Sequence, residues 1–159
     1  MAGRIVNLFL DSHVIFSGLL SDTGAPRIVL DILSLNLPFL SGLTDEFNLL
    51  EIERNLKRKL PGVFSVYRKY FSRINLQIVP LPRPAQLKDF SGMVAEKDVP
   101  VLVSAIRGGA DFLIPGDKRH FGKIKLPAPY ALKIVAPSEF VDLFLPEIIK
   151  TAPRLEKES

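Results

Sequence analysis

Residues 96–121 have the sequence EKDVPVLVSAIRGGADFLIPGDKRHF, and this stretch decides the fold. Its first half is mostly apolar from Val99 to Ile106 and predicts a helix from Val99 to Arg107, which Gly108 and Gly109 end. Residues 111–114 predict a short buried strand, and a Pro-Gly-Asp turn follows directly. A helix that leads into a buried strand is typical of α/β proteins with a mainly parallel sheet.

The rest of the chain continues this alternation. Residues 4–10 are mostly apolar and predict a buried strand that ends at Asp11. Asp45 is a suitable N-cap for a helix that runs to about residue 59. We expect further strands at 38–41, 75–80 and 132–136, helices at 14–20, 26–35, 64–74 and 137–145, and an irregular surface crossing at 80–96.

Length and composition indicate one globular domain. The chain has 159 residues, 47% of them apolar, and we expect a domain over residues 1–148 and a charged, frayed tail over 149–159. No apolar run approaches the roughly 18 residues of a membrane helix. The first residues lead straight into a strand, so we expect no signal peptide. Cysteine is absent, which fits the cytoplasmic location that we expect.

Four acids occupy related positions in this predicted fold. In parallel sheets, binding sites lie at the carboxyl ends of the strands. Asp11 follows the first strand, Asp117 follows the strand at 111–114, and Asp98 begins the helix before that strand. Glu51 borders the apolar stripe of its own helix. Taken singly, Asp98 could be an N-cap, Asp117 a turn residue and Glu51 a solvated side chain. Asp11 is harder to dismiss, because an acid that ends a buried strand needs a partner.

Together, these acids suggest a metal site. Converging carboxylates repel one another, and a divalent cation would remove that repulsion. With two histidines and no cysteine in the chain, carboxylates would have to hold the ion, which favours Mg²⁺ or Mn²⁺. The residue pattern therefore predicts that Asp11, Glu51, Asp98 and Asp117 form a carboxylate site for a divalent cation, which could lower the pKa of a bound water and stabilise charge on a phosphate.

Positive charge is concentrated in two stretches that contain no acid. The net charge is +4, and 12 of the 21 basic residues lie in residues 54–73 and 118–133. Such fields attract polyanions, although a plain solvated surface has the same appearance. Each stretch starts beside a candidate ligand. We therefore expect Arg54, Arg58, Lys118 and Arg119 to contact substrate phosphates.

Several motifs resemble the PIN-domain family, in particular its toxin branch from toxin–antitoxin pairs. The similar segments are LFLDSHVIFSGLLSDTGAPRIVLDIL (8–33), LLEIERNLKRKL (49–60), the stretch at 96–121, and KIVAPSEFVDLF (133–144). They follow the order and spacing of the family over nearly the whole chain.

The resemblance implies a five-stranded parallel sheet between helices and an endoribonuclease that uses one or two Mg²⁺ or Mn²⁺ ions. It gives the acidic roles to Asp11, Glu51, Asp98 and Asp117, with hydrolysis by in-line attack at phosphorus. It also implies an RNA substrate, a small antitoxin protein as partner, and a homodimer. Asp111 belongs to the family pattern too, but it starts its strand at the far end from the site, so we interpret it as structural.

Two positions depart from the family pattern. His13 stands where an asparagine is usual, and Pro115 replaces a hydroxyl residue before Gly116. Ser12 keeps a hydroxyl beside Asp11, and we expect Ser12 and His13 to contact the substrate. The departures leave open a second hypothesis, a catalytically weak PIN-like module that binds RNA or protein. A third, a phosphoryl-transfer or receiver-type protein, needs a second acidic cluster near the start of the chain, and residues 1–10 contain no acid.

Overall fold

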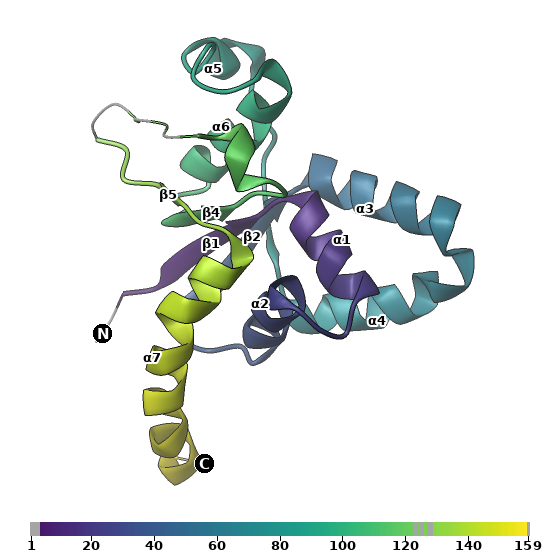
Figure 1. Cartoon of the computed structure of the whole chain (residues 1–159), viewed down its shortest axis with the longest axis vertical. Helices are drawn as coiled ribbons and strands as arrows, with labels where there is room; N and C mark the ends of the chain where they lie inside the picture. Colours follow the sequence, from purple (N-terminus) through teal and green to yellow (C-terminus); the bar gives the residue numbers. More distant parts are fainter. Residues whose placement is uncertain (1–3, 123, 125, 127–128, 159) are drawn as a thin grey trace.

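The sheet contains five strands, and every neighbouring pair is parallel. A computed structural model describes residues 4–122, 124, 126 and 129–158. The strands lie in the order β3-β2-β1-β4-β5 (Figure 1). Their bounds are β1 Val6–Leu10, β2 Leu40–Asp45, β3 Gln77–Val79, β4 Phe112–Ile114 and β5 Lys133–Ile134. The chain therefore runs outward from β1 to β3 and crosses back to β4. The carboxyl ends of β1 and β4 lie at this reversal of strand order, where α/β proteins place their sites.

The helices follow the strands as expected for an α/β fold. Their bounds are α1 Ser12–Leu20, α2 Ala25–Ser34, α3 Glu46–Lys59, α4 Phe64–Ile74, α5 Pro84–Lys88, α6 Val99–Arg107 and α7 Pro137–Glu158. Short 3-10 turns at Pro61–Val63, Glu96–Asp98 and Lys118–His120 join some of them. The predicted α/β class with a five-stranded parallel sheet is confirmed.

Alternating side chains of the strands build a core on each face of the sheet. Leu8 and Leu10 of β1 point to one face, where α1, α2, α3, α4 and α7 cover them. Phe9 points to the opposite face, which is covered chiefly by α6. All three side chains are fully buried. Because β1 is covered on both sides, it is a nearly continuous apolar run, as is usual for a central parallel strand.

Three segments differ most from the sequence-based expectation, and several other strands and helices begin or end one or two residues from where they were expected. β2 covers residues 40–45 and not 38–41, because the polar Thr44 and Asp45 are buried within hydrogen bonds. The segment at 80–96, expected to be irregular, contains α5. The frayed tail expected at 149–159 is helical through Glu158, since α7 continues past residue 145 and Ile148 still packs on the core. This helix extends away from the sheet and ends at the C-terminus (Figure 1).

Among the described residues, we find no helix that combines the length and the apolar character needed to cross a membrane.

The packing of α1 on α2 depends on a missing side chain. A Cβ on Gly18 would lie 2.5 Å from Leu30 Cδ1 and 2.9 Å from the Pro26 carbonyl oxygen. We expect Gly18→Ala to lower the free energy of unfolding by about 1–2 kcal/mol, because this overpacking outweighs the gain in helix propensity. Urea unfolding with an unchanged m-value measures the difference.

Gly62→Ala is the matched control, because a Cβ there would meet nothing within 4 Å. Its stability should stay within about 0.5 kcal/mol of wild type. A Gly18→Ala protein as stable as wild type would show that α1 and α2 can separate at no cost.

Candidate functional site

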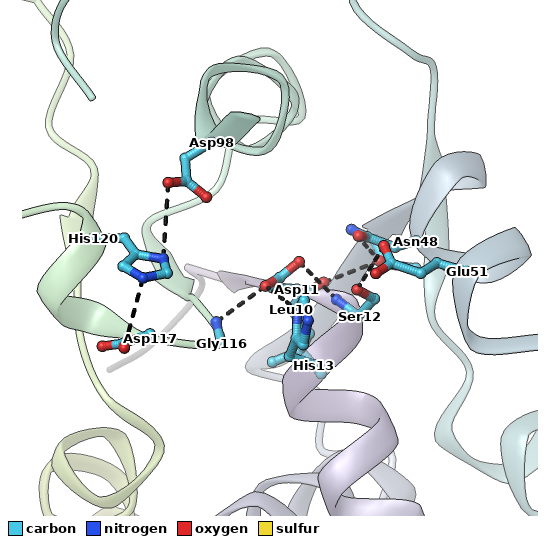
Figure 2. Close-up of polar contacts among 11 residues, drawn as sticks. Leu10, Asp11, Ser12, His13, Asn48, Glu51, Asp98, Gly116, Asp117 and His120 are labelled. Atoms are coloured by element: carbon cyan, nitrogen blue, oxygen red, sulfur yellow. Dashed lines mark hydrogen bonds and ion pairs between the residues drawn. The ribbon is translucent and has the colours of Figure 1, made fainter. Parts of the chain in front are cut away.

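The four acids singled out in the sequence line one cleft at the carboxyl edge of the sheet. The cleft has a volume of about 660 Å³, and Asp11, Glu51, Asp98 and Asp117 are all among its lining residues. They come from four different elements: the end of β1, helix α3, the start of α6 and the turn after β4 (Figure 2). The fold therefore brings together residues that are separated by more than a hundred positions.

Asp11 is held by a backbone amide at each of its two carboxylate oxygens. It caps α1, and its Oδ1 accepts a hydrogen bond from the Ser12 amide at 2.8 Å. Its Oδ2 accepts one from the Gly116 amide at 3.0 Å and lies 3.3 Å from His13 Nδ1 (Figure 2). Two backbone donors from different segments thus fix both oxygens of this carboxylate.

Gly116 can approach Asp11 because it has no side chain. A Cβ at this position would lie 2.6 Å from His13 Cβ and 3.0 Å from Asp11 Oδ2. The first distance is far below van der Waals contact. Any larger residue would therefore move the turn after β4 away from the end of β1.

Glu51 is held by a buried hydroxyl from α1. Ser12 Oγ donates to Glu51 Oε2 at 3.1 Å, and Ser12 itself is buried. Glu51 is therefore not the solvated helix residue that it resembles when taken alone. Ser12 was expected to contact substrate, but it does not line the cleft, and its hydroxyl is directed at Glu51.

Asp98 carries a buried oxygen without a hydrogen-bond partner. Asp98 occupies the N-cap position of α6, yet its side chain makes no capping hydrogen bond. Its buried Oδ2 accepts no hydrogen bond, and His120 Nδ1 lies 3.9 Å away, beyond hydrogen-bond range. A cap role therefore does not explain this carboxylate, and a buried acceptor without a donor is costly.

Asp117 is bound by Arg119. The guanidinium donates from Nε to Oδ1 at 3.1 Å and from Nη2 to Oδ2 at 2.9 Å, and the Arg119 amide adds a bond to Oδ1 at 2.9 Å. These hydrogen bonds lower the pKa of Asp117 to about 2. Asp117 is therefore a carboxylate at neutral pH, but its oxygens are turned to Arg119.

His120 lies between two of the acids. Its Nε2 is 3.7 Å from Asp117 Oδ2, and its Nδ1 faces Asp98, as Figure 2 shows. Sequence reasoning missed His120, although its position three residues after Asp117 places it on the same turn. It also missed Lys97, which lines the cleft next to Asp98.

A buried series of hydrogen bonds connects α3 and β2 to the backbone next to Asp11. Asn48 Nδ2 donates to Thr44 Oγ1 at 3.2 Å, and Thr44 Oγ1 donates to the Leu10 carbonyl at 3.0 Å. Thr44 and Asn48 are almost fully buried. The Leu10 carbonyl belongs to the peptide that leads into Asp11, so this series ties β2 and α3 to the backbone of the first acid.

The expected phosphate contacts are only partly in the cleft. Arg54, Arg58 and His13 line it, as their spacing from Glu51 and Asp11 suggested. Lys118 and Arg119 do not, because Lys118 pairs with Glu139 at 2.7 Å and Arg119 pairs with Asp117. Lys123 and Lys125 of the same basic stretch lie outside the described residues.

Asp111 has the structural role expected of it. Its carboxylate accepts hydrogen bonds from the Asn7 amide and the Arg4 guanidinium, at the start of β1. In the register of β1 and β4, Leu10 pairs with Ile114, so Asp111 lies at the opposite end of these strands from Asp11.

The donor set suits a hard divalent cation, although the ligands are not gathered. All four acids supply oxygen, which Mg²⁺ and Mn²⁺ prefer, and Asp98 Oδ2 accepts no hydrogen bond from the described residues. Within the described part of the chain, however, no three His, Cys, Asp or Glu side chains stand close enough to hold one ion. Arg119 binds both oxygens of Asp117, so this carboxylate is not directed at the other three acids.

Comparison with known proteins adds no assignment to this site. A scan against protein-family models and a search of curated proteins both found no match to the chain.

Proposed function

We propose that this chain is a metal-dependent endoribonuclease that hydrolyses phosphodiester bonds in the cleft at the carboxyl edge of the sheet. The observation that carries the proposal is the buried Asp98 Oδ2, which accepts no hydrogen bond and shares its cleft with three further carboxylates. A structural role would have given this oxygen a donor. A cation ligand needs none in the protein.

Asp11, Asp98 and Asp117 would hold Mg²⁺ or Mn²⁺, with Glu51 beside them. A bound cation of this kind lowers the pKa of water and stabilises negative charge on a phosphate. The choice of RNA as substrate follows from the resemblance of residues 96–121 to the PIN-domain family and is part of the proposal.

The protein's own groups would prepare the site for this chemistry. The Ser12 and Gly116 amides hold Asp11 in one orientation, and the Ser12 hydroxyl holds Glu51. Such fixed carboxylates need no rearrangement when a cation arrives. Arg54 and Arg58 line the same cleft and supply positive charge for the phosphates of a bound strand.

Asp98→Asn is the sharpest test of catalysis. The exchange removes a negative charge but breaks no hydrogen bond to the buried Oδ2, so we expect the fold to persist. Because cation binding stabilises the transition state by several kcal/mol, kcat/KM should fall at least about a hundredfold. Cleavage of a fluorescent RNA with Mn²⁺ or Mg²⁺ gives the rate, and urea unfolding monitors the fold.

Asp22→Asn is the control, since Asp22 is exposed between α1 and α2 and lies outside the cleft. It should cleave RNA like wild type. Wild-type turnover in Asp98→Asn, or no cleavage by the wild-type protein with either metal, would refute the proposed function.

Arg119→Gln should strengthen cation binding. Arg119 competes with a cation for the Asp117 oxygens, and this exposed contact must break before Asp117 can act as a ligand. Since exposed ion pairs are weak, the dissociation constant for Mn²⁺ should fall only about two- to fivefold. Isothermal titration with Mn²⁺ measures it.

Lys118→Gln removes the same charge from the neighbouring residue, which pairs with Glu139. Comparing the two variants separates the effect of the Arg119–Asp117 contact on Mn²⁺ affinity from the effect of removing one positive charge. An equal gain in both variants would show that the Arg119 contact does not limit cation binding.

The arginines of α3 should set the salt dependence of RNA binding. Each phosphate contact on a single strand contributes about −0.7 to the slope of log K against log salt. Arg54→Gln/Arg58→Gln should therefore flatten the slope by about 1.4 and leave Mn²⁺ affinity within a few-fold of wild type. Fluorescence anisotropy in EDTA measures binding without cleavage.

The control variant is Lys69→Gln/Arg73→Gln, which removes two exposed charges from α4, outside the cleft. If this control flattens the slope as much as the α3 variant does, the strand does not follow the cleft.

A further inference from the structure

Two large apolar side chains stand exposed at the mouth of the acidic cleft. Phe47 and Leu50 are each 58% exposed, although both are large hydrophobic residues. They lie three residues apart in α3, so they are neighbours on one face of the helix. Both line the cleft. We call this pair the α3 ledge.

The position of the α3 ledge distinguishes it from ordinary exposed apolar surface. Single exposed hydrophobic residues are common on proteins and need no explanation. Here an aromatic ring and an aliphatic side chain adjoin each other in the cleft that holds the carboxylates. Val101 of α6, which is partly buried, lines the same cleft. The cleft therefore has an apolar part as well as a charged one.

One face of α3 presents three kinds of side chain in sequence. Phe47, Glu51, Arg54 and Arg58 are separated by four, three and four residues, so they form one stripe along the helix, and all four line the cleft. At 1.5 Å per residue, Phe47 and Arg54 are about 10 Å apart along the axis. An aromatic ring, an acid and two cations thus follow one another on a single rigid element.

The geometry points to the α3 ledge as a base-binding subsite, in which an unpaired nucleobase stacks on Phe47 and contacts Leu50 while the phosphates of the same strand lie on Arg54 and Arg58. This inference rests on the proposed function for its choice of a nucleic acid as ligand. It assigns a role in binding to residues that hold neither the cation nor the phosphate.

Charge favours a nucleic acid over a protein as the occupant. A nucleotide strand carries an aromatic base and an anionic phosphate at every step, so it matches a ring followed by two arginines. Proteins that bind single strands combine such a stacking ring with a positively charged groove. Protein interfaces are likewise enriched in aromatic residues and arginine, but a repeating phosphate that matches two arginines on one helix face is a property of a nucleotide strand.

The test compares two strands that share a backbone. A short fluorescent oligouridine is titrated against the full-length protein in EDTA, beside a strand of equal length whose ribose-phosphate units lack bases. Phe47→Ala should weaken binding of oligouridine about tenfold, because stacked aromatic rings contribute strongly to single-strand binding. The strand without bases should bind wild type and Phe47→Ala equally. Phe47→Tyr should restore the preference for the strand with bases, and Phe47→Leu should not.

Leu35→Ala is the matched control, because Leu35 is similarly exposed at 59% and lies outside the cleft. It should bind both strands as wild type does. Equal loss of both strands in Phe47→Ala, or no loss of either, would overturn the inference, as would a wild-type protein that binds no strand. Loss of a protein partner in Phe47→Ala, with strand binding intact, would assign the α3 ledge to that partner.

The result is independent of catalysis, because EDTA prevents cleavage. Base-dependent binding at Phe47 in a protein that never cleaves RNA would refute the proposed function and keep the subsite. If the protein cleaves RNA in the presence of the metal but Phe47→Ala binds both strands like wild type, the proposed function stands and the subsite is refuted.

Discussion

The close approach of Gly116 to Asp11 is the contact on which the rest of the site depends. Parallel pairing of β1 with β4 brings the two strand ends together, and the Asp11 amide donates to the Ile114 carbonyl at 3.1 Å. The Gly116 amide then reaches Asp11 Oδ2, which only a residue without a side chain allows. This contact fixes the path of the turn, and through the turn it places Asp117 and His120 opposite Asp98 (Figure 2).

The two halves of the cleft differ in how firmly they are held. On the side of β1 and α3, backbone amides, the Ser12 hydroxyl and the buried Thr44–Asn48 pair hold Asp11 and Glu51 from several directions. On the side of β4 and α6, Asp98 has an oxygen without a donor, and Asp117 depends on an exposed arginine. The side chains of Asp11 and Glu51 are thus held in place without a ligand, whereas those of Asp98 and Asp117 can still change their orientation.

The sequence allowed the positions of the acids to be predicted, but not their partners. Asp11 and Asp117 follow strands, and Glu51 follows the helical period, so short-range patterns suffice to place them. The bonds of Ser12 to Glu51 and of Arg119 to Asp117 depend on rotamers and turn geometry, which no local pattern encodes. The end of β2 was misplaced for a related reason. Thr44 and Asp45 resemble loop residues until their buried hydrogen bonds are known.

The charges of the cleft suggest why a cation and a polyanion would favour each other there. Four carboxylates line it together with three cations, Arg54, Arg58 and Lys97. A phosphate alone would gain from the arginines but would be repelled by the carboxylates. In the proposed enzyme, a divalent cation would neutralise those acids and so leave the arginines free to attract the strand. By thermodynamic linkage, a strand that binds more tightly in the presence of the cation must in turn tighten the binding of the cation. If both ligands bind as proposed, the exposed ion pair of Arg119 with Asp117 would matter little, because the two ligands together would offset its loss.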